Sequence, residues 1–126
     1  AAIRDALGMA GIRAHDLDLL SLYDCYGVLV LITLEDLGIC APGNAPDWLR
    51  EHDVSHRGAV ALNTHGGQLS CGQADLAGGM GHVVEAVRQL RGTAGERQMA
   101  APRLALVTGN GATMGEEVAI VLEGIQ

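Results

Sequence analysis

The sequence contains no lysine and no phenylalanine, and its aromatic residues are two tyrosines and one tryptophan. Eight arginines against fifteen acidic residues leave a net charge of −7. A basic stripe that would neutralise the phosphates of a nucleic acid, or the charge of an anionic membrane surface, is therefore missing. We expect neither a nucleic-acid partner nor binding to a membrane.

Long hydrophobic runs are also missing. No apolar run is longer than the five residues from Val28 to Ile32, which are far too few to span a bilayer. The chain opens with Ala-Ala-Ile-Arg, without a charged-then-apolar signal. Cys25, Cys40 and Cys71 are odd in number and are not spaced like zinc ligands or a disulfide framework. These features predict a cytoplasmic protein without a metal site, and the start without methionine indicates a piece of a longer chain.

Glycine and aliphatic residues are abundant instead. The 126 residues include eighteen glycines, and 48% of the chain is hydrophobic. A chain of this length suits one domain with a single core. Small residues let helices lie close to a sheet, so this composition favours an α/β domain. We therefore expect residues 1–126 to form one such domain.

The periodicity of apolar residues predicts alternating helices and strands. The nearly continuous apolar run from Leu17 to Leu22 is typical of a buried parallel strand. Strands separated by helices pair in parallel, whereas the last two strands are joined by a short glycine loop and should form an antiparallel hairpin. The expected helices are 1–10, 27–37, a short one within 41–58 and a long one ending near Gly92, and the expected strands are 17–22, 59–62, 104–108 and 117–122.

The stretch from Asn63 to Gly92, NTHGGQLSCGQADLAGGMGHVVEAVRQLRG, joins a strand to the long helix through a polar glycine loop. On the helix, Glu85, Arg88 and Arg91 are expected to pair along the surface and His82 to be solvated. A loop above a helix start is a good place for a site, because backbone N–H groups favour negative charge there. A loop that only turns the chain is the alternative. The apolar residues that should form the buried stripe of the helix are Leu76, Met80, Val83, Val84, Val87 and Leu90.

Three segments together resemble the C-terminal half of thiolase-fold enzymes, and in particular the branch of sterol-carrier-protein thiolases and bacterial lipid-transfer proteins. They are YDCYGVLVLITLEDLGIC, NTHGGQLS with GGMGHVVEAVRQLRG, and LALVTGNGATMGEEVAIVLEG. The resemblance covers nearly the whole chain. It implies an α/β half-domain with a mostly parallel mixed sheet, a C-terminal antiparallel hairpin and helices on both faces. The family's nucleophilic cysteine lies in the N-terminal half, which is absent here.

Members of this family make or break a carbon–carbon bond next to an acyl-CoA thioester. The resemblance therefore implies an acyl-CoA substrate, no resident cofactor, and a partner that is the missing N-terminal half or a second subunit, with a homo-oligomer expected. Acyl transfer, lipid transfer and retro-aldol cleavage are all compatible with it. The alternative is a non-catalytic thiolase-like module that binds a partner subunit or an acyl ligand.

Two loops match the family's active-site loops. In YDCY, Tyr23 stands where ordinary thiolases have a histidine or asparagine that helps to build an oxyanion hole. The resemblance makes Tyr23 a catalytic candidate, because a phenol can donate a hydrogen bond or carry a proton. A tyrosine that only covers the core is the alternative. Asp24, the next residue, is a candidate for orienting the loop through hydrogen bonds.

In the glycine loop, Gln73 stands at the histidine of the family's Gly-His-Pro motif, and glutamine cannot titrate. His65 is then the titratable catalytic candidate, with a histidine bonded to backbone as the alternative. In the terminal loop Thr113 and Met114 stand in the region where thiolases place a second cysteine. The candidates for substrate binding are Asn63, Gly66, Gly67, Ser70, Gln73 and Gly111.

Overall fold

The computed structural model describes residues 1–111 and 115–125. Its sheet has the strand order β2-β1-β3-β4. The short strand β1 (Leu19–Ser21) lies parallel to β2 (Ala61–Leu62) on one side and to β3 (Leu104–Gly111) on the other. β3 and β4 (Glu116–Glu123) form an antiparallel hairpin. The mostly parallel mixed sheet with a C-terminal hairpin, predicted from the sequence, is confirmed.

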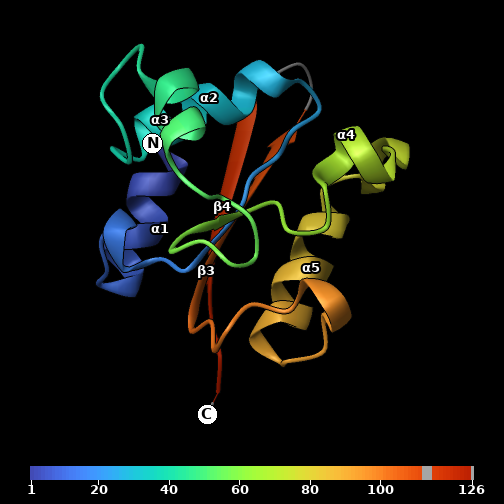
Figure 1. Cartoon of the computed structure of the whole chain (residues 1–126). Helices are drawn as coiled ribbons and strands as arrows, with labels where there is room; N and C mark the ends of the chain where they lie inside the picture. Colours follow the sequence, from blue (N-terminus) through green and yellow to red (C-terminus); the bar gives the residue numbers. More distant parts are fainter. Residues whose placement is uncertain (112–114, 126) are drawn as a thin grey trace.

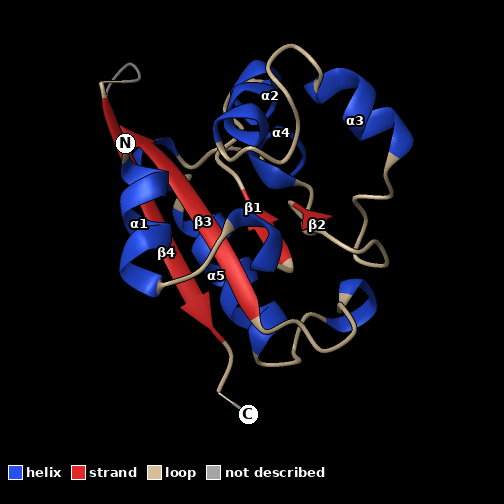
Figure 2. Ribbon diagram, turned by 90° about the vertical axis from the view of Figure 1, so that its left-hand side faces the viewer, coloured by secondary structure: helices blue, strands red, loops and turns tan. Residues whose placement is uncertain are grey.

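Helices lie on both faces of this sheet, as Figures 1 and 2 show. Two of them, α1 and α2, pack on one face, and α5 packs on the other. The short helix α3 lies beside α2, and α4 precedes α5 in the chain. The bounds are Ala2–Ala10 for α1, Gly27–Asp36 for α2, Ala45–Glu51 for α3, Gly67–Cys71 for α4 and Met80–Leu90 for α5.

The core has two layers, because successive residues of a strand point to opposite faces of the sheet. The layer under α1 and α2 contains Leu20 and Leu106, both fully buried. The layer under α5 contains Leu19 and Ala105 together with Ala86 of the helix itself. The apolar run around β1 is nearly continuous for this reason, since both faces of a central parallel strand are covered.

The apolar stripe predicted for the long helix is wrong in part, since only Val83 and Leu90 of its members pack against the core cluster under α5. Leu76 is 99% exposed and lies outside α5, in a 3-10 turn, while Met80 and Val84 are 57% and 45% exposed. The predicted stripe is therefore displaced from the centre of the face against the sheet, because that face is mostly polar. Its buried residues are His82, Glu85, Ala86 and Gln89.

The helix α2 is apolar almost all round but is buried along one side. Leu29, Val30 and Leu34 are buried, whereas Val28 and Ile32 are 56% and 46% exposed. The outward side of α2 is thus an uncovered apolar surface. Across the described residues, no helix combines the length and the apolar character that crossing a bilayer requires.

Candidate functional site

The candidate site lies where the parallel strands end. β1 leads into the YDCY segment, β2 leads into the glycine loop, and the far end of β3 is glycine-rich. The carboxyl ends of parallel strands meet at one edge of a sheet, which is where ligands bind in α/β folds. An open cavity of about 670 Å³ lies there, lined by residues of YDCY, of segment 73–79 and of the β3–β4 hairpin. Its volume is in the range of small-molecule sites.

The structure brings three of the predicted site residues to this cavity, although they are far apart in the sequence. Tyr23, Gln73 and Gly111 all line it. Thr113 and Met114 lie outside the described residues. The remaining candidates are not part of the cavity lining, and the roles of all eight in catalysis or substrate binding stay predictions. These remaining candidates are Asn63, His65, Gly66, Gly67 and Ser70.

Asp24 organises the glycine loop. Its side chain is buried, and its two oxygens accept hydrogen bonds from the backbone N–H groups of Gln68, at 2.7 Å, and Leu69, at 3.3 Å. These N–H groups belong to the first turn of α4, where backbone donors lack partners within the helix. Asp24 therefore caps α4 from a distant segment. It is a structural hydrogen-bonding residue, as predicted, but the loop that it holds is the glycine loop and not its own YDCY loop.

The two glycines of the loop allow this close approach. Gly66 has φ +94° and Gly67 has φ +67°, in the left-handed region that favours glycine. A Cβ on Gly67 would collide with the Asp24 carboxylate, and one on Gly66 would lie 2.8 Å from the Cβ of Ser70. The backbone of the glycine loop therefore lies in close contact with the Asp24 carboxylate, which residues with a side chain at these positions would prevent.

Asn63 uses its side chain to join the ends of two strands. Its Oδ1 accepts a hydrogen bond from the N–H of Leu22 at 2.7 Å, and its Nδ2 donates to the carbonyl of Leu22 at 2.9 Å. Asn63 also has a positive φ of 44°, a conformation that asparagine tolerates better than most residues. Both functions of its carboxamide are occupied by the protein.

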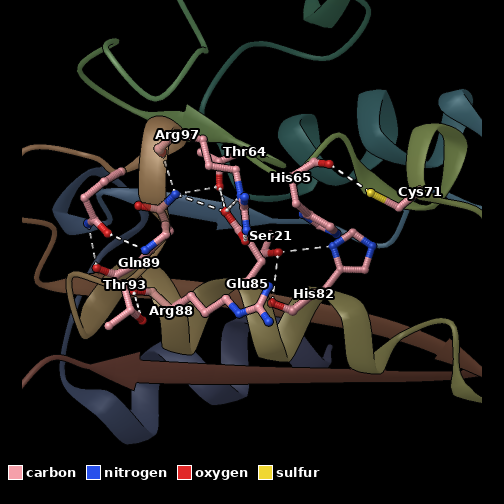
Figure 3. A network of polar contacts seen from close by, with 12 residues as sticks. Ser21, Thr64, His65, Cys71, His82, Glu85, Arg88, Gln89, Thr93 and Arg97 are labelled. Carbon is pink, nitrogen blue, oxygen red and sulfur yellow. Dashed lines mark hydrogen bonds and ion pairs between the residues drawn. The ribbon is translucent and has the colours of Figure 1, made fainter.

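His82 is fully buried, so the prediction that it is solvated is wrong. Its Nδ1 lies 3.1 Å from Ser21 Oγ, and its Nε2 lies 3.2 Å from Asp24 Oδ1. Figure 3 shows the His82 ring pointing toward Ser21. The side-chain nitrogen of Gln68 is 3.5 Å from the same Nε2. Since these residues come from β1, YDCY, α4 and α5, one buried polar cluster holds four elements together.

His65 lies beside this cluster. Its ring packs edge-on against the ring of His82, with centroids 5.0 Å apart. Its Nδ1 is buried without a hydrogen-bond partner among the described residues, and its backbone oxygen accepts a hydrogen bond from the Cys71 thiol at 3.0 Å. The structure thus places His65 against buried His82 and outside the cavity lining.

Burial lowers the pKa of both histidines. For His65, burial outweighs the opposite effect of the nearby carboxylates of Glu85 and Asp24. For His82, burial and the neighbouring His65 outweigh the attraction and hydrogen bond of Asp24. Both imidazoles are therefore neutral at pH 7.

Acidification should destabilise the protein through these two histidines. Their folded-state pKa values lie below the unfolded value of about 6.5, so the unfolded state binds protons first as the pH falls. We expect the free energy of unfolding to be lower at pH 5.5 than at pH 7.5 in urea titrations, and the difference to shrink in His82→Gln. His15 is exposed, so His15→Gln is the control, and this variant should keep the full difference in unfolding free energy between the two pH values. Equal stability of the unmodified protein at both pH values would contradict the expectation.

A second buried polar cluster lies further along α5, as Figure 3 shows. Glu85 is 2% exposed and accepts hydrogen bonds from Arg97 Nη2 at 2.8 Å and from Thr64 Oγ1 at 2.6 Å. The amide group of Gln89 donates to Glu85 Oε1 at 3.0 Å and to Thr64 Oγ1 at 3.1 Å. The predicted surface pairing of Glu85 with arginines of its own helix is therefore wrong, because its partner Arg97 follows the helix.

These contacts decide the ionisation of Glu85. Burial raises the pKa of its carboxyl, but the hydrogen bonds from Arg97, Thr64 and Gln89 outweigh burial and hold the pKa below its ordinary value. Thr64 is the residue before His65, so this ionised carboxylate anchors the start of the glycine loop on α5.

Comparisons with known proteins agree with this architecture. Residues 1–124 match the sequence profile of the family described as "Thiolase C-terminal domain-like". The chain is 38% identical to "Sterol carrier protein 2" of Gallus gallus over 97 residues, which are 77% of this chain and 18% of that protein. It is 40% identical to "17-hydroxy-3-oxo-4-pregnene-20-carboxyl-CoA lyase" of Mycobacterium tuberculosis over 90 residues, 71% of this chain and 22% of that protein.

A solved structure is similar over almost the whole chain. It is "Ltp2-ChsH2(DUF35) aldolase", with a TM-score of 0.83 and 32% identity, and the match covers 98% of this chain and 31% of that one. This similarity confirms the predicted α/β architecture. The chain spans about a fifth of the length of the two curated relatives.

Proposed function

Because this chain belongs to the family of thiolase C-terminal-like domains, we propose that it is the C-terminal domain of a thiolase-like enzyme that acts on acyl-CoA thioesters. The reaction breaks or forms a carbon–carbon bond, and retro-aldol cleavage is the form that the relatives support best. One relative is named as a carboxyl-CoA lyase, and the similar solved structure is titled an aldolase.

The observation that carries the proposal is the position of Tyr23. It lines the cavity together with Gln73 from the glycine loop and with Gly109 and Gly111 from the end of β3. A phenol there can donate a hydrogen bond to a developing oxyanion or carry the proton that leaves or enters the substrate. The glycines let an acyl group approach the backbone closely.

Gln73 and His65 have different parts in this proposal. Gln73 orients the substrate through hydrogen bonds, because its amide can donate and accept but cannot titrate. His65 is proposed as the second acid–base candidate, supported by its place in the glycine loop and its neutral state. Since Tyr23 lines the cavity and His65 does not, Tyr23 is the acid–base candidate that we propose to contact the substrate directly.

The Tyr23→Phe substitution in the complete protein tests this function. We expect turnover of an acyl-CoA thioester to fall about 10²-fold, the usual contribution of a positioned acid or base, with unchanged unfolding. Tyr26→Phe removes a second hydroxyl from the same cavity and is the matched control, which should lower turnover far less. Equal turnover of Tyr23→Phe and the unmodified enzyme would contradict the proposal.

A non-catalytic module is the second candidate function. Gln73 favours it, because the glutamine stands where a thiolase needs a titrating histidine. Such a module would bind an acyl-CoA or a partner subunit in the same cavity. It predicts that Tyr23→Phe changes ligand affinity while the complete protein shows no cleavage, whereas the enzyme predicts loss of cleavage with affinity nearly unchanged.

We further propose that an N-terminal thiolase-like half or another subunit covers the apolar surface of this domain, and that the isolated 126-residue chain self-associates, most simply as a dimer. Val28 and Ile32 of α2 are exposed, as are Val118 and Ile120 of the edge strand β4. Exposed apolar surface of this kind usually marks a contact. Sedimentation equilibrium should show a dimer, with the polar segment 41–58 outside the contact. A compact monomer at high concentration that binds no apolar dye would contradict this.

A further inference from the structure

The backbone ladder of β1 ends just before the catalytic candidate. Leu20 is paired with Leu62 of β2, and Ser21 is paired with Val107 of β3, which are the last backbone pairs on the two sides. Tyr23 lies two residues beyond this point. Beyond this point the chain leaves the ladder, and Tyr23 lines the cavity.

Side chains take over where the backbone pairing stops. On the β2 side, the residue after Leu62 is Asn63, whose carboxamide bonds both peptide groups of Leu22. On the β3 side, the residue after Val107 is Thr108, whose hydroxyl oxygen accepts a hydrogen bond from the backbone N–H of Tyr23 at 2.9 Å. Each neighbouring strand is thus followed or continued by one residue whose side chain hydrogen-bonds the backbone just after β1.

We infer that Thr108 is a positioning residue for Tyr23, an inference that rests on the function proposed for Tyr23. Thr108 is 9% exposed and directly precedes Gly109, which lines the cavity with Tyr23. One hydroxyl therefore ties the segment that carries the phenol to the glycine wall of the cavity. The distance between the reacting groups depends on this tie, and a misplacement of about 1 Å can cost 10²-fold in rate.

The peptide group that joins Leu22 to Tyr23 is held from both sides. Asn63 Nδ2 donates to its carbonyl oxygen, and its N–H donates to the Thr108 hydroxyl. Among the described residues, that N–H has no other hydrogen-bond acceptor. Without the hydroxyl this planar unit is held on the β2 side alone, so the segment that carries the phenol loosens on the β3 side while the neighbouring strands remain paired.

Thr108→Val in the complete protein tests the inference, because valine keeps the shape of threonine and lacks the acceptor. We expect hydrogen exchange of the Tyr23 amide to rise at least about tenfold and kcat to fall about tenfold with KM nearly unchanged. Thr108→Ser, which restores the hydroxyl, should recover both. Thr93→Val is the control, since that hydroxyl is exposed and bonds only the carbonyl of Arg88 within the described residues.

The exchange measurement decides the inference without relying on activity. Unchanged exchange of the Tyr23 amide in Thr108→Val would overturn it, and so would full kcat in that variant while Tyr23→Phe is impaired. If Tyr23→Phe were as active as the unmodified enzyme, the function proposed for Tyr23 would fail, and the exchange of Thr108→Val and Thr108→Ser would still show whether Thr108 fixes that segment.

Discussion

An Asp24→Ala variant should lose about 2 to 4 kcal/mol of unfolding free energy, one of the two largest losses that we expect from one substitution in this domain. The carboxylate has three buried partners, which are the N–H groups of Gln68 and Leu69 and the ring of His82. Uncapping a helix costs about 1 kcal/mol, and leaving a buried polar group without a partner costs about 1 to 3 kcal/mol. Urea denaturation of the variant and of the unmodified protein measures the total loss of unfolding free energy.

Two variants sharpen the Asp24 experiment. Asp24→Asn keeps the size of the side chain and one acceptor oxygen, so it should lose about half as much. Asp5→Ala removes an exposed carboxylate from α1 and should change stability little. A loss below about 1 kcal/mol in Asp24→Ala would mean that the glycine loop does not depend on this cap.

The fold was largely predictable because its strands follow the simplest rules of burial. Leu19 and Leu20 point to opposite faces of a sheet covered on both sides, so the run that contains them is apolar without alternation. The short glycine loop between the last two strands predicted the hairpin correctly. These signals are local, and each can be recognised within a few residues.

The polar face of α5 could not be predicted in the same way. Periodicity analysis assumes that a buried face is apolar, but here His82 and Glu85 are buried while Met80 and Val84 are exposed. The burial of His82 depends on Ser21, which is 61 residues away in the sequence. Polar residues at helical spacing from His82 to Gln89 were the available signal, and only their distant partners distinguish this face from a solvated one.

The candidate site was predictable in part. The resemblance of two loops to the family's active-site loops named Tyr23 and Gln73 in advance of the structure, which places both at one cavity. The same resemblance could not separate residues that line the cavity from those that support it, such as Asn63. Thr108 was missed because its contact depends on where the backbone ladder stops, and strand ends are the least certain part of a sequence-based assignment.

The second large effect should follow from Glu85→Ala, with a loss of about 2 to 4 kcal/mol. The substitution leaves the guanidinium of Arg97, the hydroxyl of Thr64 and the amide of Gln89 without their shared acceptor. Removing one partner of a buried ion pair costs about 3 to 5 kcal/mol. The Arg97 side chain is 37% exposed, so water recovers part of its hydrogen bonding and the expected loss is somewhat smaller.

A double-mutant cycle with Glu85→Gln and Arg97→Ala isolates the pair, and we expect a coupling energy of about 1 to 3 kcal/mol at pH 7. The folded-state pKa of Glu85 is lowered, so its stabilisation is present above the unfolded value of about 4.3 and is lost as the pH falls through the folded-state value. The coupling should therefore persist at pH 5.5, where the histidine effect has already appeared, and should vanish only in stronger acid. A coupling near zero at pH 7 would show that Thr64 and Gln89, rather than Arg97, hold the carboxylate in place.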